Sequence, residues 1–152
     1  MPEPAKSVDV QAYQGRWYEL ARFDNRFERG CEGVTADYTL RPNGELKVVN
    51  TCRKGAPDGP VKQAKGWAKV VPDSGNAKLK VSFFGPFFGD YWVLDHADDY
   101  AWTIVGEPTG GYLWIMARNP RPDAETIATL KARATALGYD ISTLRDTRQP
   151  PS

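Results

Sequence analysis

The chain has 152 residues, enough for one domain with a hydrophobic core of its own. Lys and Arg number 20 and Asp and Glu 19, so the formal net charge of +1 indicates no basic field for nucleic acid or for an acidic membrane. The five Trp, seven Tyr and six Phe stand out, because aromatic residues favour strands and must either be buried or face a ligand.

Residues 1–7 are polar and proline-rich, and they lack the apolar core of a signal peptide. No apolar run is long enough to span a bilayer as a helix. From the residues alone, we expect either a cytoplasmic protein or an exported chain whose signal segment is absent. Residues 8–14 predict a short helical turn capped by Ser7 or Asp9.

Eight extended runs make up most of the chain. They are predicted at residues 17–23, 34–40, 45–52, 61–71, 77–84, 90–95, 100–106 and 111–118. Turns rich in Gly, Pro, Asn and Asp join them, for example Pro42-Asn43-Gly44, which predicts a hairpin. Strands at this spacing, with no helices between them, are typical of a sandwich or an up-and-down barrel and argue against an α/β fold.

One helix is expected after the last strand, at about residues 123–137. Pro122 and Asp123 favour its start, Gly138 favours its end, and apolar residues recur along one side. That apolar side must pack against the outside of the sheet. The tail, residues 143–152, is expected to be flexible.

Three ordered motifs resemble the signature regions of the lipocalin family. They are Gly15-Arg16-Trp17-Tyr18-Glu19, the run at residues 89–95, and the run at residues 113–118 before the helix. Residues 22–30 and 81–87 are closer still to the bacterial outer-membrane lipocalins, which are relatives of apolipoprotein D. The resemblance extends from about residue 8 to about residue 145, nearly the whole chain.

This resemblance implies an all-β fold in a single domain, residues 1–152: an eight-stranded antiparallel barrel at about residues 15–118, with the helix packed outside. In the family, the Trp of the first strand closes one end and the Arg ending the last strand packs across it. Mapped onto this chain, the structural signature is Gly15, Trp17 and Arg118. A guanidinium over an indole is a favourable contact of about 0.5–2 kcal/mol, so we interpret these residues as structural.

The barrel interior is the expected ligand site, because eight strands can leave room for one small ligand. Strand alternation proposes the inward-facing residues. The proposed ligand-binding residues are Glu19, Ala21, Ala36, Tyr38, Leu46, Val48, Leu79, Val81, Phe83, Tyr91, Val93, Trp102, Ile104, Tyr112 and Trp114. The resemblance implies that the ligand is a fatty acid or a lysophospholipid, bound non-covalently for transport or storage. The alternative is a barrel packed solid with its own side chains, with a structural or interaction role.

Phe84, Phe87 and Phe88 lie in a turn expected near the open end of the barrel. Exposed phenylalanines there could contact a membrane surface, guide a lipid, or form a homodimer with a second copy of the chain. The competing interpretation is that they fold back over the rim of the barrel.

Cys31 and Cys52 lie on either side of the hairpin turn at residues 41–44 and could form a disulfide, although strand register does not assure it. A disulfide would imply an oxidising compartment such as the periplasm. A few lipocalins are enzymes, including one that uses a barrel cysteine, and either residue could act in this way only as a free, inward-facing thiol of low pKa.

Nothing else in the sequence predicts an enzyme. The one histidine, His96, lies in a loop beside aspartates and has no second ligand at metal spacing, so we predict no metal site. No Ser-His-Asp ordering or phosphate-binding loop is present, and we predict no cofactor and no nucleic-acid partner.

The resemblance implies a location at the bacterial cell envelope, in the outer membrane or the periplasm. Outer-membrane members carry a lipidated cysteine at the mature N-terminus, and no cysteine precedes Cys31 in this chain. We therefore expect that the signal and anchor segment is absent from this chain, with a soluble cytoplasmic protein as the alternative.

Overall fold

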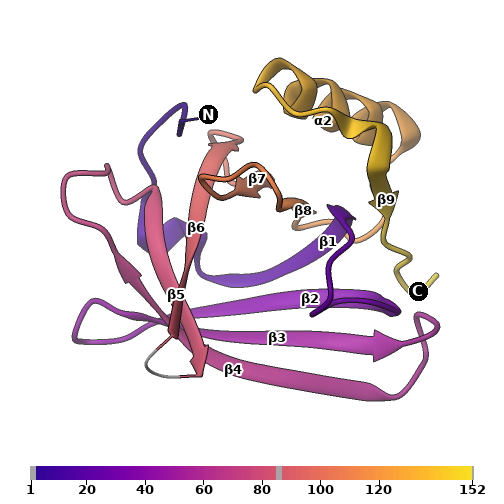
Figure 1. The fold of residues 1–152 in the computed structure, drawn as a ribbon, viewed down its shortest axis with the longest axis horizontal. Coiled ribbons are helices and arrows are strands. Elements are labelled where there is room, and N and C mark those ends of the chain that lie inside the picture. The colour runs from indigo at the N-terminus through magenta and orange to yellow at the C-terminus, as the bar shows by residue number, and fades with distance from the viewer. Residues whose placement is uncertain (1–2, 85–86, 152) are drawn as a thin grey trace.

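The computed structural model describes residues 3–84 and 87–151, apart from the side chains of Phe84, Phe87 and Phe88. Within these residues it confirms the predicted fold, an eight-stranded antiparallel barrel with one long helix outside (Figure 1). The roles considered for the three phenylalanines concern side chains that lie outside the described residues. No helix of the described chain has the length and apolar character needed to cross a membrane.

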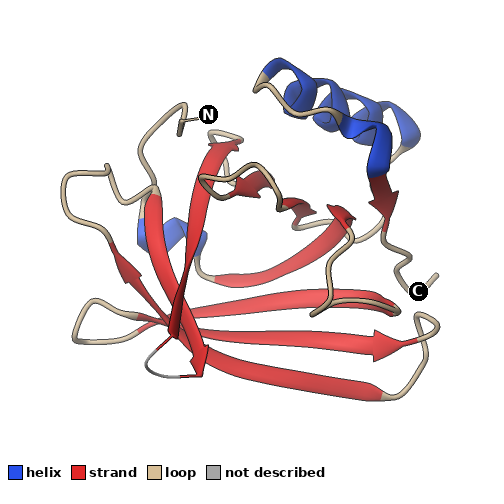
Figure 2. Ribbon diagram, in the orientation of Figure 1, coloured by secondary structure: helices blue, strands red, loops and turns tan. Residues whose placement is uncertain are grey.

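The strands are β1 (Gly15–Phe23), β2 (Cys31–Leu40), β3 (Leu46–Lys54), β4 (Val61–Val70), β5 (Lys78–Phe84), β6 (Phe87–His96), β7 (Trp102–Gly106), β8 (Leu113–Ala117) and a short β9 (Leu144–Asp146). The helical segments are α1 (Val10–Tyr13), α2 (Ala124–Ala136) and the 3-10 turn η1 (Ile141–Thr143). From β1 to β8 each strand pairs with the next, and β1 pairs with both β2 and β8, which closes the barrel (Figure 2).

Helix α2 lies outside the barrel, on the side of β7, β8 and β1 and away from β3 and β4 (Figure 1). The Asp123 carboxylate caps its start by accepting a hydrogen bond from the Thr126 backbone N–H at 2.8 Å. Leu130 and Ala134 form its buried face. Gly138 follows the helix with φ +108°, a conformation that favours glycine.

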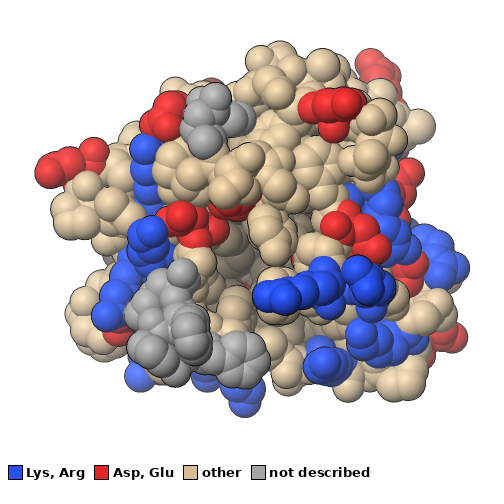
Figure 3. Space-filling model, viewed as in Figure 1, with Lys and Arg blue, Asp and Glu red and all other residues tan. Residues whose placement is uncertain are grey.

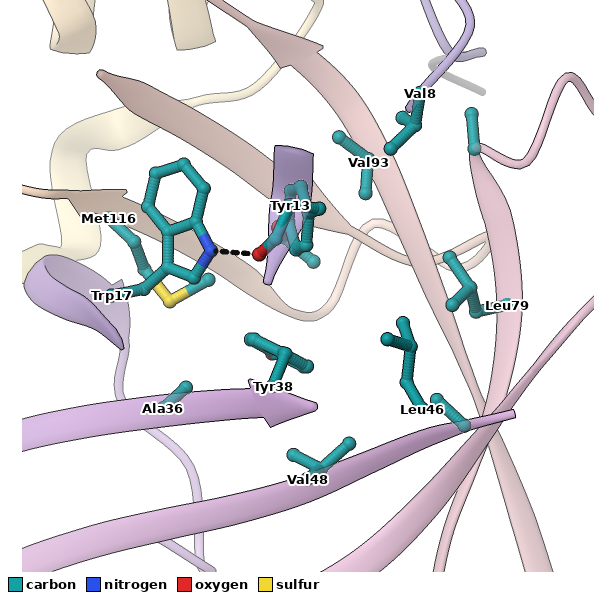
Figure 4. Close-up of a cluster of buried hydrophobic side chains, with 13 residues drawn as sticks. Val8, Tyr13, Trp17, Ala36, Tyr38, Leu46, Val48, Leu79, Val93 and Met116 are labelled. Carbon is teal, nitrogen blue, oxygen red and sulfur yellow. Dashed lines mark hydrogen bonds between the residues drawn. The ribbon is translucent and has the colours of Figure 1, made fainter. Parts of the chain in front are cut away.

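The protein has two apolar clusters, one inside the barrel and one between its outer wall and α2. The buried residues of the inner cluster are Val8, Tyr13, Trp17, Ala36, Tyr38, Leu46, Val48, Ala68, Ala77, Leu79, Val93, Val105 and Met116, most of which are labelled in Figure 4. The buried residues of the outer cluster are Leu20, Ala21, Leu94, Ile104, Leu113, Ile115, Ala117, Leu130, Ala134 and Tyr139. The strands that pack against α2 are therefore apolar on both faces.

The C-terminal segment fills a split in the barrel wall. β1 pairs with β2 only over Gly15–Tyr18, and β9 pairs with β1 from Ala21 to Phe23, where β1 has left β2. The Gly33 N–H donates to the Arg148 carbonyl at 2.7 Å, and the Gln149 amide donates to backbone carbonyls of β1 and β2. Part of the segment expected to be a flexible tail therefore has hydrogen-bond partners in the barrel wall, and these partners are distant in sequence and leave no local pattern.

Candidate functional site

The closed end of the barrel is built around Trp17. Its indole is fully buried and donates to the Tyr13 carbonyl at 2.9 Å (Figure 4). The Arg118 guanidinium lies 3.7 Å from the centre of the indole and donates to four backbone carbonyls at 2.8–3.3 Å, including those of Arg16 and Gln14. Gly15 has φ +98°, and a Cβ there would lie 3.4 Å from the guanidinium. These three residues occupy the structural positions expected from the sequence.

Three tyrosines fill the deep half of the lumen, next to the closed end. The Tyr91 hydroxyl lies 2.8 Å from that of Tyr13 and accepts from that of Tyr38 at 2.9 Å, and Tyr13 also reaches Thr103 at 3.2 Å. Burial raises the pKa of Tyr13 to about 12, and it raises the pKa values of Tyr38 and Tyr91 above the ordinary tyrosine range. The hydroxyls therefore stay neutral and satisfy one another.

The space left in this deep half is small. A void of about 10 Å³ remains, which is about the size needed for one water molecule. It is lined by Val8, Val10, Tyr13, Tyr38, Leu46, Ala68, Asn76, Leu79, Val81, Tyr91 and Val93. The deep lumen of this structure is thus largely occupied by the protein's own side chains.

The mouth half of the lumen is more open. Asn50 of β3 lies two residues after Val48, which belongs to the inner cluster, so both face the lumen. Ala64 of β4 pairs in register with Asn50 and therefore lies on the same inner face. Ala64 is exposed and Asn50 is partly exposed. Phe83 and Trp114 pack against the inner cluster and are also only partly buried. Apolar and aromatic groups on the inner wall of the mouth half therefore face solvent.

A buried arginine, Arg22, lies near the open-end terminus of β1. Arg22 is fully buried, and its guanidinium donates to Glu19 at 2.9 Å and to Asp24 at 3.1 Å, with a Glu28 carboxylate oxygen 3.6 Å away. Glu28 also accepts from the Trp114 indole N–H at 2.6 Å. Burial raises the pKa of Glu19, and the neighbouring Glu28 adds to this rise. With three carboxylates around its guanidinium, Arg22 has no unpaired positive charge to offer to a ligand.

Most of the proposed ligand-binding residues face the lumen, although contact with a ligand stays a prediction for each of them. Those in or against the inner cluster are Ala36, Tyr38, Leu46, Val48, Leu79, Val81, Phe83, Tyr91, Val93 and Trp114. Tyr112 stacks on Trp114 with ring centres 5.5 Å apart. Glu19 pairs in register with Met116 of the inner cluster, but its carboxylate is already engaged by Arg22 and Thr147.

Three of the proposed lining residues, Ala21, Trp102 and Ile104, do not face the lumen. Trp102 and Ile104 lie in the outer cluster, while Thr103 and Val105, between and beyond them, point inward. Both faces of β7 are apolar because α2 covers the outer one, so alternation could not assign them. Ala21 also lies in the outer cluster, because a β-bulge between Glu19 and Ala21 reverses the side on which the following residues lie.

Two groups of lumen residues lie outside the set that strand alternation proposes. One group, Tyr13, Val8 and Val10, comes from the segment before β1, for which the sequence predicts only a helical turn. Simple alternation from Trp17 would put Arg22 on the opposite face of β1, and the bulge turns it inward. An arginine flanked by Ala21 and Phe23 within a strand is the one sequence feature that could have indicated a buried charge.

Cys31 and Cys52 form a disulfide in the structure, with their Cα atoms 5.2 Å apart. It links the ends of β2 and β3 at the open end, where the register shifts between Glu32 and Thr35. Neither residue is a free thiol.

A barrel closed at one end by an indole and an arginine, open at the other end and apolar along its inner wall is a calyx, the architecture of small-ligand binding barrels. A family model described as a lipocalin-like domain matches residues 8–149, and the chain belongs to the lipocalin family.

Similar proteins agree with the resemblance drawn from the motifs. The chain is 43% identical over 159 residues to the outer membrane lipoprotein Blc of Escherichia coli, covering 99% of this chain and 88% of that protein. It is 38% identical over 159 residues to apolipoprotein D of Mus musculus, covering 97% of this chain and 80% of that protein. Insecticyanin of Manduca sexta has the same fold, with a TM-score of 0.79 at 19% identity, covering 99% of this chain and 86% of that one.

Proposed function

We propose that this lipocalin binds one single-chain amphiphile without a covalent bond, a fatty acid or a lysophospholipid, and carries or stores it. The observation that carries the proposal is the partial exposure of Phe83 and Trp114 on the inner wall of the barrel. Apolar surface that faces water in a lumen gains free energy when a hydrocarbon tail covers it. The tail would therefore lie along these rings, with its headgroup at the mouth.

The deep half of the lumen limits how far the tail enters. Its void of about 10 Å³ is far below the roughly 300–1,000 Å³ of small-molecule pockets. A tail that reaches past Phe83 must displace side chains of the tyrosine group, Tyr13, Tyr38 and Tyr91. The mouth half is thus the first place that a tail occupies.

The charges favour a headgroup that stays at the mouth. Glu19, Asp24 and Glu28 surround Arg22, so this guanidinium has no unpaired positive charge to offer to a carboxylate or phosphate. Lys62 pairs in register with Cys52 at the start of β4, is exposed, and offers an anionic headgroup a partner at the mouth.

We place this activity at the bacterial cell envelope. The support is the disulfide between Cys31 and Cys52, which suits an oxidising compartment, and the similarity to proteins named outer membrane lipoprotein. The proposal is a binding role and not an enzymatic one, because both cysteines are engaged and no thiol is available for catalysis.

The second candidate is a filled barrel with a structural or interaction role at the envelope. The small deep void favours it. The two candidates differ in one measurable property, the saturable uptake of a single-chain lipid.

The test is equilibrium dialysis of oleate and of oleoyl-lysophosphatidylethanolamine with delipidated protein. Ala64→Trp places a bulky ring on the inner wall of the mouth, and Gln63→Trp places the same ring one residue away on the outer wall, where the side chain is exposed. We expect saturable binding of one lipid per chain in the unmodified protein and in Q63W, and a loss of at least about tenfold in A64W.

Absence of saturable uptake of both lipids by the unmodified protein would leave the filled barrel as the explanation. Equal binding by A64W and Q63W would place the ligand outside the lumen and would also overturn the proposal. Circular dichroism of both variants shows whether each retains the fold.

A further inference from the structure

The open end of the barrel carries a set of positive charges that the overall net charge conceals. The loop between β1 and β2 and the turn after β3 lie side by side there: the Lys54 ammonium donates to the Arg29 carbonyl at 3.1 Å, and the Gly55 N–H donates to the Gly30 carbonyl at 2.8 Å. We call Arg26, Phe27, Arg29, Lys54, Val61 and Lys62 the basic rim. All six are exposed.

The four cations of the basic rim have no carboxylate partner among the described residues. The acids of the β1–β2 loop, Asp24 and Glu28, turn toward Arg22 instead, and Asp58 is the one acid of the turn after β3. Figure 3 shows Lys and Arg side chains gathered over the right-hand ends of β2, β3 and β4. A chain of net charge +1 thus has a locally basic edge, which net charge alone did not indicate.

The same edge exposes apolar side chains. Three large hydrophobic residues are exposed within the described chain: Phe27 at 64%, Val61 at 52% and Trp67 at 42%. Two of the three belong to the basic rim, and the Arg26 guanidinium lies 4.9 Å from the centre of the Phe27 ring. Trp67 lies on the outer wall of β4, away from the rim.

This combination matches the surface of an anionic bilayer. Arg and Lys bind lipid phosphates with their heads while their stems and a neighbouring aromatic ring enter the boundary with the acyl chains. A nucleic acid would use the cations but would leave Val61 without a role. Charge complementarity therefore favours lipid.

We propose that the basic rim docks on a bilayer that contains anionic phospholipid, with Phe27 and Val61 in the interface and the four cations on phosphates. Docking in this orientation turns the mouth of the barrel toward the membrane, so a lipid can pass between bilayer and lumen without crossing bulk water. The inference goes beyond the proposed ligand binding, because docking requires no lipid in the lumen.

The test is cosedimentation with vesicles of phosphatidylglycerol mixed with phosphatidylcholine, compared with vesicles of phosphatidylcholine alone. We expect binding to the anionic vesicles at low ionic strength and a strong reduction at high salt, because salt screens exposed charges. Each cation near such a surface strengthens partitioning by about fivefold, so Arg29→Gln with Lys54→Gln should weaken binding by about 25-fold.

The matched control uses the opposite end of the same two strands. Arg41→Gln with Lys47→Gln removes two charges near the β2–β3 turn, at the closed end, and should leave vesicle binding within about twofold of the unmodified protein. Phe27→Ser should weaken binding, and Trp67→Ser, which removes an exposed ring from the outer wall, should not.

Equal losses in the two double variants, a larger loss in W67S than in F27S, or equal binding to the two kinds of vesicle would each overturn the proposal. Dialysis of oleate in vesicle-free solution reports on the lumen separately. A failure of docking is thereby distinguished from a failure of the proposed ligand binding.

Discussion

Replacing Arg118 with Met tests how the closed end of the barrel is held. The substitution keeps an aliphatic stem and removes the guanidinium, with its four hydrogen bonds to carbonyls at 2.8–3.3 Å and its contact with Trp17 at 3.7 Å. With about 1 kcal/mol for each hydrogen bond, because the group is partly exposed, and about 1 kcal/mol for the cation–π contact, we expect a loss of about 3–5 kcal/mol in the free energy of unfolding. A domain of mid-range stability, about 10 kcal/mol, would still fold after such a loss.

The assay is urea unfolding followed by far-ultraviolet circular dichroism, since tryptophan emission would change with the substitution itself. Arg118→Lys keeps the charge and loses the planar fork, so it should recover about half of the loss. A double-mutant cycle of Arg118→Met with Trp17→Leu should give a coupling of about 0.5–2 kcal/mol.

A loss below about 1 kcal/mol for R118M would contradict this account of the closed end, because it would mean that water replaces the guanidinium at all four carbonyls. A coupling of zero with Trp17 would remove the cation–π contribution while leaving the hydrogen bonds in place.

Three further predictions concern groups buried in the barrel wall and lumen. Burial raises the pKa of Glu19, so the folded protein holds the proton of this carboxyl group more tightly than the unfolded chain does. The free energy of unfolding should therefore fall as pH rises from the ordinary glutamate range through the raised pKa, and Glu19→Gln should flatten that fall, measured as the urea midpoint at each pH. Burial likewise raises the pKa of Tyr91 above 10.0, so stability should fall as pH rises beyond that value, and Tyr91→Phe should make the alkaline fall shallower while costing about 1–2 kcal/mol at neutral pH. The bond between Cys31 and Cys52 closes a loop with a separation of 21 residues, so replacing both with Ser should cost about 3 kcal/mol, and unchanged unfolding of that variant would mean that the bond does not form.

The elements of the fold could be predicted because their causes are local. The turn Asn43-Gly44 requires positive φ at Gly44, which the structure has at 87°. The strands on either side form the predicted hairpin and pair from Leu40 with Leu46 onward. Asp123 and Gly138 flank α2 as their residue types predict.

The inward-facing set could be predicted only where one face of a strand meets solvent. On β3 and β5 the outer residues are mostly polar, and Val48 and Val81 were assigned correctly to the inside. On β7 the helix covers the outer wall, so Trp102 and Ile104 meet another apolar surface there and the pattern becomes ambiguous.

The polar network and the ninth strand depend on contacts between residues far apart in the chain. Arg22 lies inside because of a bulge, and Thr147 reaches Glu19 from a segment 128 residues away. No local periodicity encodes such contacts, and the proline-rich end of the chain gave no indication that it completes the wall.

The most direct test of the proposed lumen site is quenching of tryptophan emission by a lysophospholipid brominated along its acyl chain. Trp114 lies on the inner wall of the mouth half, where the tail is expected. The account predicts saturable quenching at one lipid per chain, most of which is lost in Trp114→Phe. Tryptophan emission that the brominated lipid leaves unchanged in the unmodified protein would contradict a tail inside the barrel.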